Sequence, residues 1–530
     1  MEAPNQNGFP LVEKSTIFFI PFYLYRQDAE AESLLGTPGF VIDETEKSLW
    51  IKEQKMLTDE KEGNAIYPHI MSFLQGQMMQ GTSSRLSHLQ IYSVAKDNRL
   101  IVKRFWNKFS QSEHFIEVGD KSSSRRLSFR FINGVSNLLS PHLFIYPASG
   151  IGILSFSVSI TNEDATTEDL KLLNYHLHKI FHPLTKCVCE DLSLTGKEDS
   201  DVLKAKATIF RQARSFIGKH LEPREKNNAK ETTSEMIFSW NMLTLCHFML
   251  KDIQGSTRLF SPSRAHIFTF ATIDDAMNNR LKPKDILPDL YGLSRCVNNK
   301  YMLPLSGTDT APHFLQTFEN VHVASCVEGS AFIAVLKQEN KEHFKKFKSI
   351  IAMRYFWIYL LALVQRYSLL NIDRILIGIS FHSSSDTDSI QRYSNLLWRY
   401  LTTIQDVKVR CHFTDISSFS QHNEFYKYCC DKLHVNIAYD EIDKKTKALN
   451  LTISHDMQLL HEEEVHQQER RDHNLNLFLG ILAALQAIGI IYDFAYALFF
   501  NHDYRSAVLY LGLIILAVIM MIWLYASKKH

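Results

Sequence analysis

Two long uncharged stretches near the carboxyl end constrain this chain more than any other feature. Residues 475–492 and 506–525, eighteen and twenty residues long, contain no Asp, Glu, Lys or Arg. With a rise of 1.5 Å per residue, helices of these lengths span about 27 and 30 Å, against about 30 Å for the hydrocarbon core of a bilayer. The connector at 501–505 is too short to form a domain. The sequence therefore predicts a hairpin of two transmembrane helices within residues 475–530.

Basic residues at the ends of the two spans predict their orientation. Arg470 and Arg471 precede the first span, Lys528 and Lys529 follow the second, and the connector carries only Arg505. Cytoplasmic flanks of membrane helices are enriched in Lys and Arg. We therefore expect both termini in the cytoplasm, two spans in the inner (cytoplasmic) membrane, and a cytoplasmic body formed by the residues before the hairpin.

One face of the first span carries polar side chains. Gln486 and Asp493 fall on this face in a 3.5-residue repeat, and such groups inside a membrane usually face partners or a water-filled cavity. In a ring of identical subunits they would form an amide ring and an acidic ring that line a pore. Alternatively, Gln486 hydrogen bonds between helices and Asp493 lies at the membrane interface. The candidate pore-lining residues are Asn476, Leu479, Ala483, Gln486, Ile490 and Asp493.

An amphipathic helix is predicted over residues 441–474, leading into the first span. Apolar residues recur at intervals of three, four or seven from Ile442 onward, and no proline interrupts residues 441–500. A single helix of that length would extend about 90 Å. Its acidic cluster, Glu462–Glu464 with neighbouring histidines, could bind a divalent cation between subunits or could be a solvated face; the sequence leaves the metal unknown.

The residues before this helix predict a large mixed body of the α+β class. Apolar runs bounded by turn residues predict strands at 17–25, 89–94, 127–132, 143–146, 151–160, 266–273, 321–326 and 331–336, and helical spacing appears at 168–181 and 202–220. A charged linker at 222–233 separates a first region, residues 1–221, from a second, residues 234–440. The apolar stretch 350–370 contains Arg354, Gln365 and Arg366, so we expect a buried helix rather than a third span.

Charge, cysteines and motifs narrow the function classes. A formal net charge of +1 gives no global basic field, so direct binding of DNA or RNA is not expected. The eight cysteines lack the spacings of a zinc cluster or a disulfide framework, which favours free thiols. A nucleotide P-loop, a dinucleotide-binding glycine fingerprint, H-E-x-x-H and G-x-S-x-G are all missing from the sequence. The sequence therefore predicts no enzyme and no resident cofactor.

Two groups of residues are candidates for binding a small anionic ligand. The first is the turn 121–126, where hydroxyl groups, backbone amides and paired guanidinium groups could hold a phosphate, or which could be an ordinary exposed loop. The second is a pair of arginines in the apolar helix, which could face an anion or pair with carboxylates. The candidates are Ser122, Ser123, Ser124, Arg125, Arg126, Arg354 and Arg366.

The order of body, long helix and terminal hairpin resembles the CorA family of pentameric cation channels. In that family the first span ends in Tyr-Gly-Met-Asn at the outer mouth of the pore. The corresponding residues here are Tyr492, Asp493, Phe494 and Ala495, so only the tyrosine matches. The large body and the segment from Arg354 to Tyr367 look like the enlarged CorA-like proteins, some of which accompany type III CRISPR systems.

The resemblance implies a function, a ligand and an assembly. Members of the enlarged branch act as membrane effectors in antiviral defence, opened by a nucleotide second messenger such as the SAM–AMP conjugate. The leading hypothesis is a homopentameric channel whose body binds a small anionic nucleotide and whose long helix carries the change to the pore. The alternatives are a divalent cation (magnesium) channel or transporter, and a membrane-anchored scaffold without a pore.

Overall fold

The computed structural model describes residues 8–25, 49–53, 66–75, 89–94, 101–118, 125–133, 138–180, 187–189, 238–250, 253, 256–259, 264–275, 281, 283–297, 314–318, 320–337, 342, 351–378, 395, 398, 401–402, 404–405, 413–499, 505, 508–509, 511–516 and 518–519. The chain divides into two compact units. The first, which we call the body, comprises Met1–His382 and Asn395–Lys447, and the second comprises Ser383–Ser394 and Ala448–His530.

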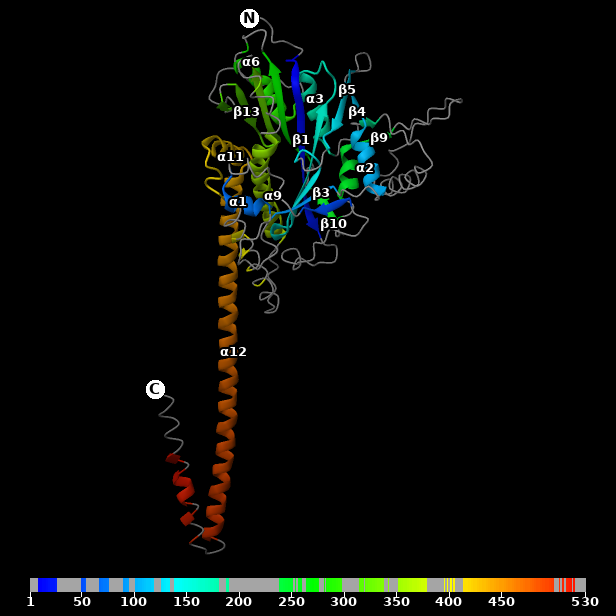
Figure 1. Ribbon diagram of the computed structural model, residues 1–530. Helices are drawn as coiled ribbons and strands as arrows, with labels where there is room; N and C mark the ends of the chain where they lie inside the picture. The colour runs from blue at the N-terminus through cyan, green and yellow to red at the C-terminus, as the bar shows by residue number, and fades with distance from the viewer. Residues whose placement is uncertain are drawn as a thin grey trace. The chain divides into compact units, whose positions relative to one another are not determined.

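A mixed sheet of fourteen strands organises the body (Figure 1). Its main path runs in the order β12-β13-β14-β11-β1-β7-β5-β4-β8-β9, while β10 pairs with β1 and a branch of β2, β3 and β6 joins at β7. All pairings are antiparallel except that of β11 with β14. The strands are β1 (Leu11–Tyr25), β2 (Trp50–Lys52), β3 (Gln90–Val94), β4 (His114–Val118), β5 (Arg125–Phe131), β6 (His142–Tyr146), β7 (Ile151–Ile160), β8 (Cys187–Cys189), β9 (Phe238–Trp240), β10 (Ser256–Leu259), β11 (His266–Asp274), β12 (Leu315–Phe318), β13 (Val321–Ser325) and β14 (Gly329–Leu336).

Strand β1 is central and buried on both faces, which explains its nearly continuous apolar sequence. Pro21 interrupts this run without breaking the sheet. Pairing of β1 with β11 ends at Phe19, and pairing with β10 begins at Phe22. Pro21 therefore falls where β1 changes partner on that edge, and the missing backbone N–H costs no bond to either strand.

Helices cover both faces of the sheet. On one face lie α3 (Thr167–Leu177) and α6 (Pro283–Arg295), and on the other lie α9 (Phe356–Gly378) and α11 (Ser420–Lys432). The alternation of β1 explains the division, because Thr16 hydrogen bonds Asn174 of α3 while Phe19 packs on Phe356 and Tyr359 of α9. The remaining described helices are α1 (Pro68–Gln75), α2 (Ile101–Gln111), η3 (Pro147–Ser149), α5 (Met242–Leu250) and the π-helical η4 (Ile351–Tyr355).

All eight predicted strands are confirmed, and so is the assignment of residues 350–370 to a buried helix. Trp357, Leu360 and Val364 of α9 have no exposed surface, as expected for a helix inside a folded body. The predicted helix at 202–220 and the linker at 222–233 lie outside the described residues. Strands from both predicted regions, 1–221 and 234–440, join the one sheet and belong to one compact unit.

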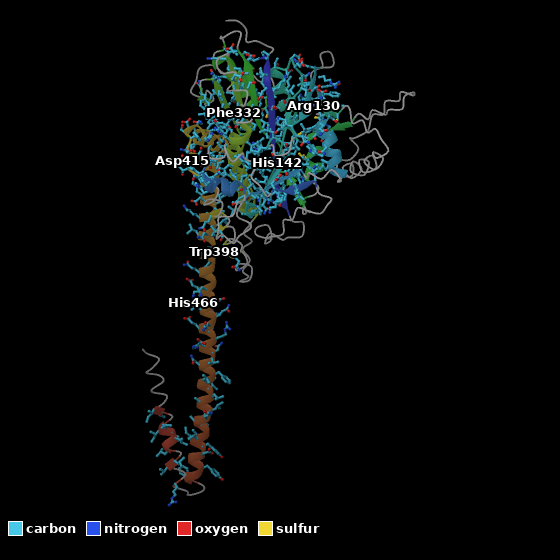
Figure 2. The ribbon with its side chains drawn as sticks, viewed as in Figure 1. Arg130, His142, Phe332, Trp398, Asp415 and His466 are labelled. Atoms are coloured by element: carbon cyan, nitrogen blue, oxygen red, sulfur yellow. The ribbon has the colours of Figure 1, made fainter. Side chains whose placement is uncertain are left out.

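Helix α12 (Val435–Phe499) is a single helix of 65 residues. It begins six residues before the predicted start at 441 and continues through the predicted boundary at 474 without a break, extending about 97 Å at 1.5 Å per residue. Its first turns belong to the body, where Ile442 is buried. Farther along, the side chain of His466 is exposed, whereas His142 and Phe332 are buried within the sheet (Figure 2).

Candidate functional site

The second half of α12 contains a stretch that is long and apolar enough to cross a membrane. This stretch is Glu464–Asp493, and none of its most apolar window is buried. Leu475, Phe478 and Leu485 each expose about 60% of their surface. A core helix of a soluble protein would bury such side chains, so this part of α12 presents apolar surface that requires a cover of lipid or of other protein chains.

The six predicted pore-lining residues all lie in this stretch. Since α12 is a regular helix here, its turn of 100° per residue gathers Asn476, Leu479, Ala483, Gln486, Ile490 and Asp493 within an arc of about 100°. Five of them are exposed and Ile490 is partly buried. The structure therefore places these residues on one face.

The second predicted span is described only in part. Residues 505, 508–509, 511–516, 518 and 519 are helical, and Leu511, Leu513 and Val518 are exposed. The other residues of 506–525 lie outside the described part of the chain. The fold is thus mixed α/β with one helix of membrane-spanning length, and the hairpin itself stays a prediction.

Inside the body, the carboxyl-terminal half of α9 contacts both the sheet and α12. On the sheet side, Ser368 donates to the Ser149 hydroxyl at 2.8 Å, and Asn371 Nδ2 donates to the Ser149 carbonyl at 2.7 Å. Arg374 completes this contact, since its guanidinium donates to Asn371 Oδ1 at 3.0 and 3.1 Å and lies 4.4 Å from the centroid of the Tyr23 ring. Ser149 belongs to the turn between β6 and β7, where Gly150 adopts a left-handed conformation with φ of 65°.

The contact to α12 is ionic. Lys445 Nζ lies 2.6 Å from Asp373 of α9 and 2.6 Å from Glu441 one turn earlier on α12. Hydrogen bonds to Asp373 and Glu441 raise the pKa of Lys445, so it stays charged at neutral pH. We call these α9 contacts with Ser149 and Lys445 the α9 joint. The α9 joint therefore connects the β6–β7 turn to α12 by way of one helix.

The candidate arginines of the β5 turn have partners of their own. Arg125 forms an ion pair of 2.9 Å with the buried carboxylate of Asp169 and a longer one of 3.5 Å with Asp164. Arg126 lies 3.7 Å from the centroid of the Phe115 ring. The serines between 122 and 124 lie outside the described residues. Because Arg125 faces two carboxylates, little of its charge is left for an added anion.

The two arginines of the apolar helix have different surroundings. Neither forms an ion pair within the described part of the chain. Arg366 donates to the carbonyl of Leu433, which caps the carboxyl end of α11, and its Nε is buried without a hydrogen-bond partner in the described structure. Arg354 Nε is likewise buried and unpartnered among the described residues. Burial, with a smaller effect of Arg354, lowers the pKa of His422 to about 4.

The described cysteines are all free thiols, as predicted. Burial raises the pKa of Cys430 to about 12 and that of Cys187 further, so both stay protonated at neutral pH and serve as small apolar residues. Within the described ranges, no three His, Cys, Asp or Glu side chains are grouped to hold a metal ion.

Comparison with known proteins adds no relative: no family model, no curated protein and no solved structure matches this chain. The function must therefore be argued from the residues described above.

Proposed function

We propose that this protein is a homo-oligomeric membrane channel whose body binds a small anionic ligand and whose helix α12 carries the resulting change to the pore. The observation that supports it most is the exposed apolar stretch of α12, which continues a helix that starts inside the body. Exposing one Leu or Phe to water costs about 1.5–3 kcal/mol. Six such residues cost on the order of 10 kcal/mol, which equals the net stability of many domains.

The polar face of the stretch supports a pore rather than a simple anchor. Gln486 and Asp493 would be costly against acyl chains, and subunits arranged around an axis would turn both toward water. Five subunits are expected from the resemblance to CorA channels. An acidic ring at Asp493 favours cations over anions.

The ligand follows from the same resemblance, which points to a nucleotide second messenger of the SAM–AMP class and to type III CRISPR antiviral defence. A ligand opens a channel only if it binds the open state more tightly than the closed one. The α9 joint offers a route for that difference, since it connects the β6–β7 turn to Lys445 of α12.

The second candidate function is a magnesium channel that needs no messenger, and it too rests on the acidic ring at Asp493. A scaffold without a pore is the third. Liposomes of phosphatidylethanolamine and phosphatidylglycerol that contain the purified protein distinguish the three. The proposed channel passes cations only after SAM–AMP is added, the magnesium channel passes them without it, and the scaffold passes none.

The pore face is tested by Asp493→Asn, with Asp440→Asn as the matched control because Asp440 is an exposed acid on α12 within the body. We expect Asp493→Asn to reduce cation over chloride selectivity severalfold and the control to leave it unchanged. Unchanged selectivity in Asp493→Asn would remove this residue from the pore.

A further inference from the structure

Besides the α9 joint, the body contains a second cluster of polar side chains. Arg366 is its one member that the sequence analysis singled out. Residues from three elements meet at the carboxyl end of α3 and the start of β11. Lys179 and Arg264 pair in an isolated β-bridge, and the backbone N–H of Ala265 donates to the carbonyl of His178 at 2.8 Å. The next residue, His266, connects this pair to α9 through Tyr367.

A chain of hydrogen bonds runs from this strand into α9. The Tyr367 hydroxyl bonds His266 Nε2 and also the guanidinium of Arg366. A guanidinium only donates, so the Tyr367 oxygen accepts from Arg366 and its own proton is left for His266 Nε2. In that arrangement the neutral imidazole carries its proton on Nδ1.

Two buried donors are then left without an acceptor. His266 is 6% exposed, and its Nδ1 has no hydrogen-bond partner in the described structure. The same holds for Arg366 Nε, next to it in the chain of bonds. An unpaired buried donor costs free energy that a bound acceptor recovers. Both unpaired groups are N–H donors, so each requires an acceptor atom with a lone pair.

Electrostatics in this region favour the charged form of an acceptor. Lys179 and Arg264 act on His178, and Arg366 acts on His266. The carboxylate that acts beside Lys179 and Arg264 on the neighbouring Cys296 is Glu328. The carboxyl ends of α3 and α11 each contribute about half a negative charge. The three cations outnumber these negative charges, so the region keeps an excess of positive charge.

The pKa values of the two histidines are consistent with this excess of positive charge. Burial lowers the pKa of His266 to about 3, and the charges that add to the effect, Arg366 and His178, are both basic. Burial likewise lowers the pKa of His178 to about 4, with further lowering by Lys179 and Arg264. Neutral imidazoles keep the excess positive charge on the three longer side chains, of which Arg264 is exposed and Lys179 partly so.

We propose that these residues, which we call the basic corner (His178, Lys179, Arg264, His266 and Arg366), bind a phosphate group of a small ligand. The exposed Arg264 and the partly exposed Lys179, whose Nζ lies 3.4 Å from the centroid of the Tyr175 ring, supply charge. The buried N–H groups of His266 and Arg366 supply directed donors. Phosphate is favoured over a carboxylate because it carries more negative charge, and because its three free oxygens can accept from both buried N–H groups and still face an exposed cation.

The position of the basic corner gives the bound ligand a consequence, which rests on the proposed channel function. Arg366 stands two residues before Ser368 and seven before Asp373, the residues through which α9 contacts the β6–β7 turn and α12. A ligand that draws Arg366 toward phosphate therefore acts on the same half-helix that contacts Lys445.

The test uses the full chain in detergent, with inorganic phosphate and pyrophosphate as probes and titration calorimetry at low salt as the measurement. We expect pyrophosphate to bind with a dissociation constant of millimolar or below. The double variant Lys179→Gln/Arg264→Gln should bind pyrophosphate at least tenfold more weakly. The matched control Lys427→Gln/Lys447→Gln removes two other exposed lysines and should change the dissociation constant less than twofold.

Either of two results would overturn the proposal. The first is that the unaltered protein does not bind pyrophosphate even at about ten times the expected millimolar dissociation constant. The second is that the double variant binds pyrophosphate as tightly as the unaltered protein. If the double variant does not fold by circular dichroism, Arg264→Gln decides, with at least a threefold loss expected. The flux assay is independent of this binding measurement. Binding without flux refutes the channel and leaves the basic corner, whereas flux with unchanged affinity in the variants refutes the basic corner alone.

Discussion

Replacing Asn371 by alanine should weaken the body more than its small volume suggests. Asn371 is 2% exposed and makes bonds in two directions, donating to the Ser149 carbonyl at 2.7 Å and accepting from Arg374 at 3.0 and 3.1 Å. The variant leaves a buried carbonyl unpaired, at about 1–3 kcal/mol, and removes a charge-assisted hydrogen bond of about 1.5–3 kcal/mol. Allowing for relaxation around the site, we expect a loss of about 3 kcal/mol in the free energy of unfolding.

Urea unfolding of the full chain in detergent, followed by the fluorescence of buried tryptophans such as Trp357, measures this loss. Asn450→Ala is the control, because Asn450 is an exposed asparagine on α12, and its effect should stay within about 0.5 kcal/mol. A loss below about 1 kcal/mol in Asn371→Ala would refute the reasoning. It would mean that water replaces both bonds and that α9 is not firmly attached to the β6–β7 turn.

Two further predictions concern the stability of the body. Lys171→Met should cost about 3–5 kcal/mol in the same unfolding assay, because it leaves the buried carboxylate of Asp289 and the nearby Glu168 without their cation; a neutral effect would show that this pair contributes nothing. Lowering the pH should also destabilise the fold. Burial lowers the pKa of His142 and His266 below 6.5, so the unfolded chain binds more protons than the folded one, and stability falls by up to about 1.4 kcal/mol per histidine for each pH unit below 6.5 until the folded pKa is reached. A stability independent of pH between 6.5 and 5 would contradict these assignments.

The strands that the sequence predicted well are long and apolar. Strands β1, β7, β11 and β14 are buried along nearly their whole length, so composition alone separates them from the turns around them. Strands β8 and β9 have three residues each, too few for any periodicity. The two cysteines of β8 are buried in a strand that pairs with β4 on one side and with β9 on the other.

Sequence patterns could not predict that strands from both regions, 1–221 and 234–440, join in one sheet. Phe18 of β1 is opposite Ile267 of β11, about 250 residues away, and Phe156 of β7 on the other side. Hydrophobic periodicity marks which faces of a strand are buried and carries no information about its neighbour. A charged stretch between two regions is equally compatible with a linker between domains and with an insertion in one.

The same distinction separates the two candidate sites. The pore face of α12 lies on one helix, so the helical period alone groups Gln486 with Asp493. The basic corner collects Lys179, Arg264 and Arg366 from three elements, and the sequence could single out Arg366 only because a charge inside an apolar run is unusual.

Helix α12 connects these observations because it meets three environments without interruption. Ile442 is buried in the body, Leu451 is 72% exposed, and the residues from Leu475 onward form the apolar stretch. Helix α12 contains no proline, so no proline kink separates Lys445 from the apolar stretch. At 100° per residue, Leu479 and Ile490 lie nearest the middle of the predicted pore face and Gln486 lies about 30° from it, so a rotation of about 30° would bring Gln486 to the middle. In the proposed channel, a rotation of that size about the helix axis would therefore alter which side chains meet the axis of the assembly.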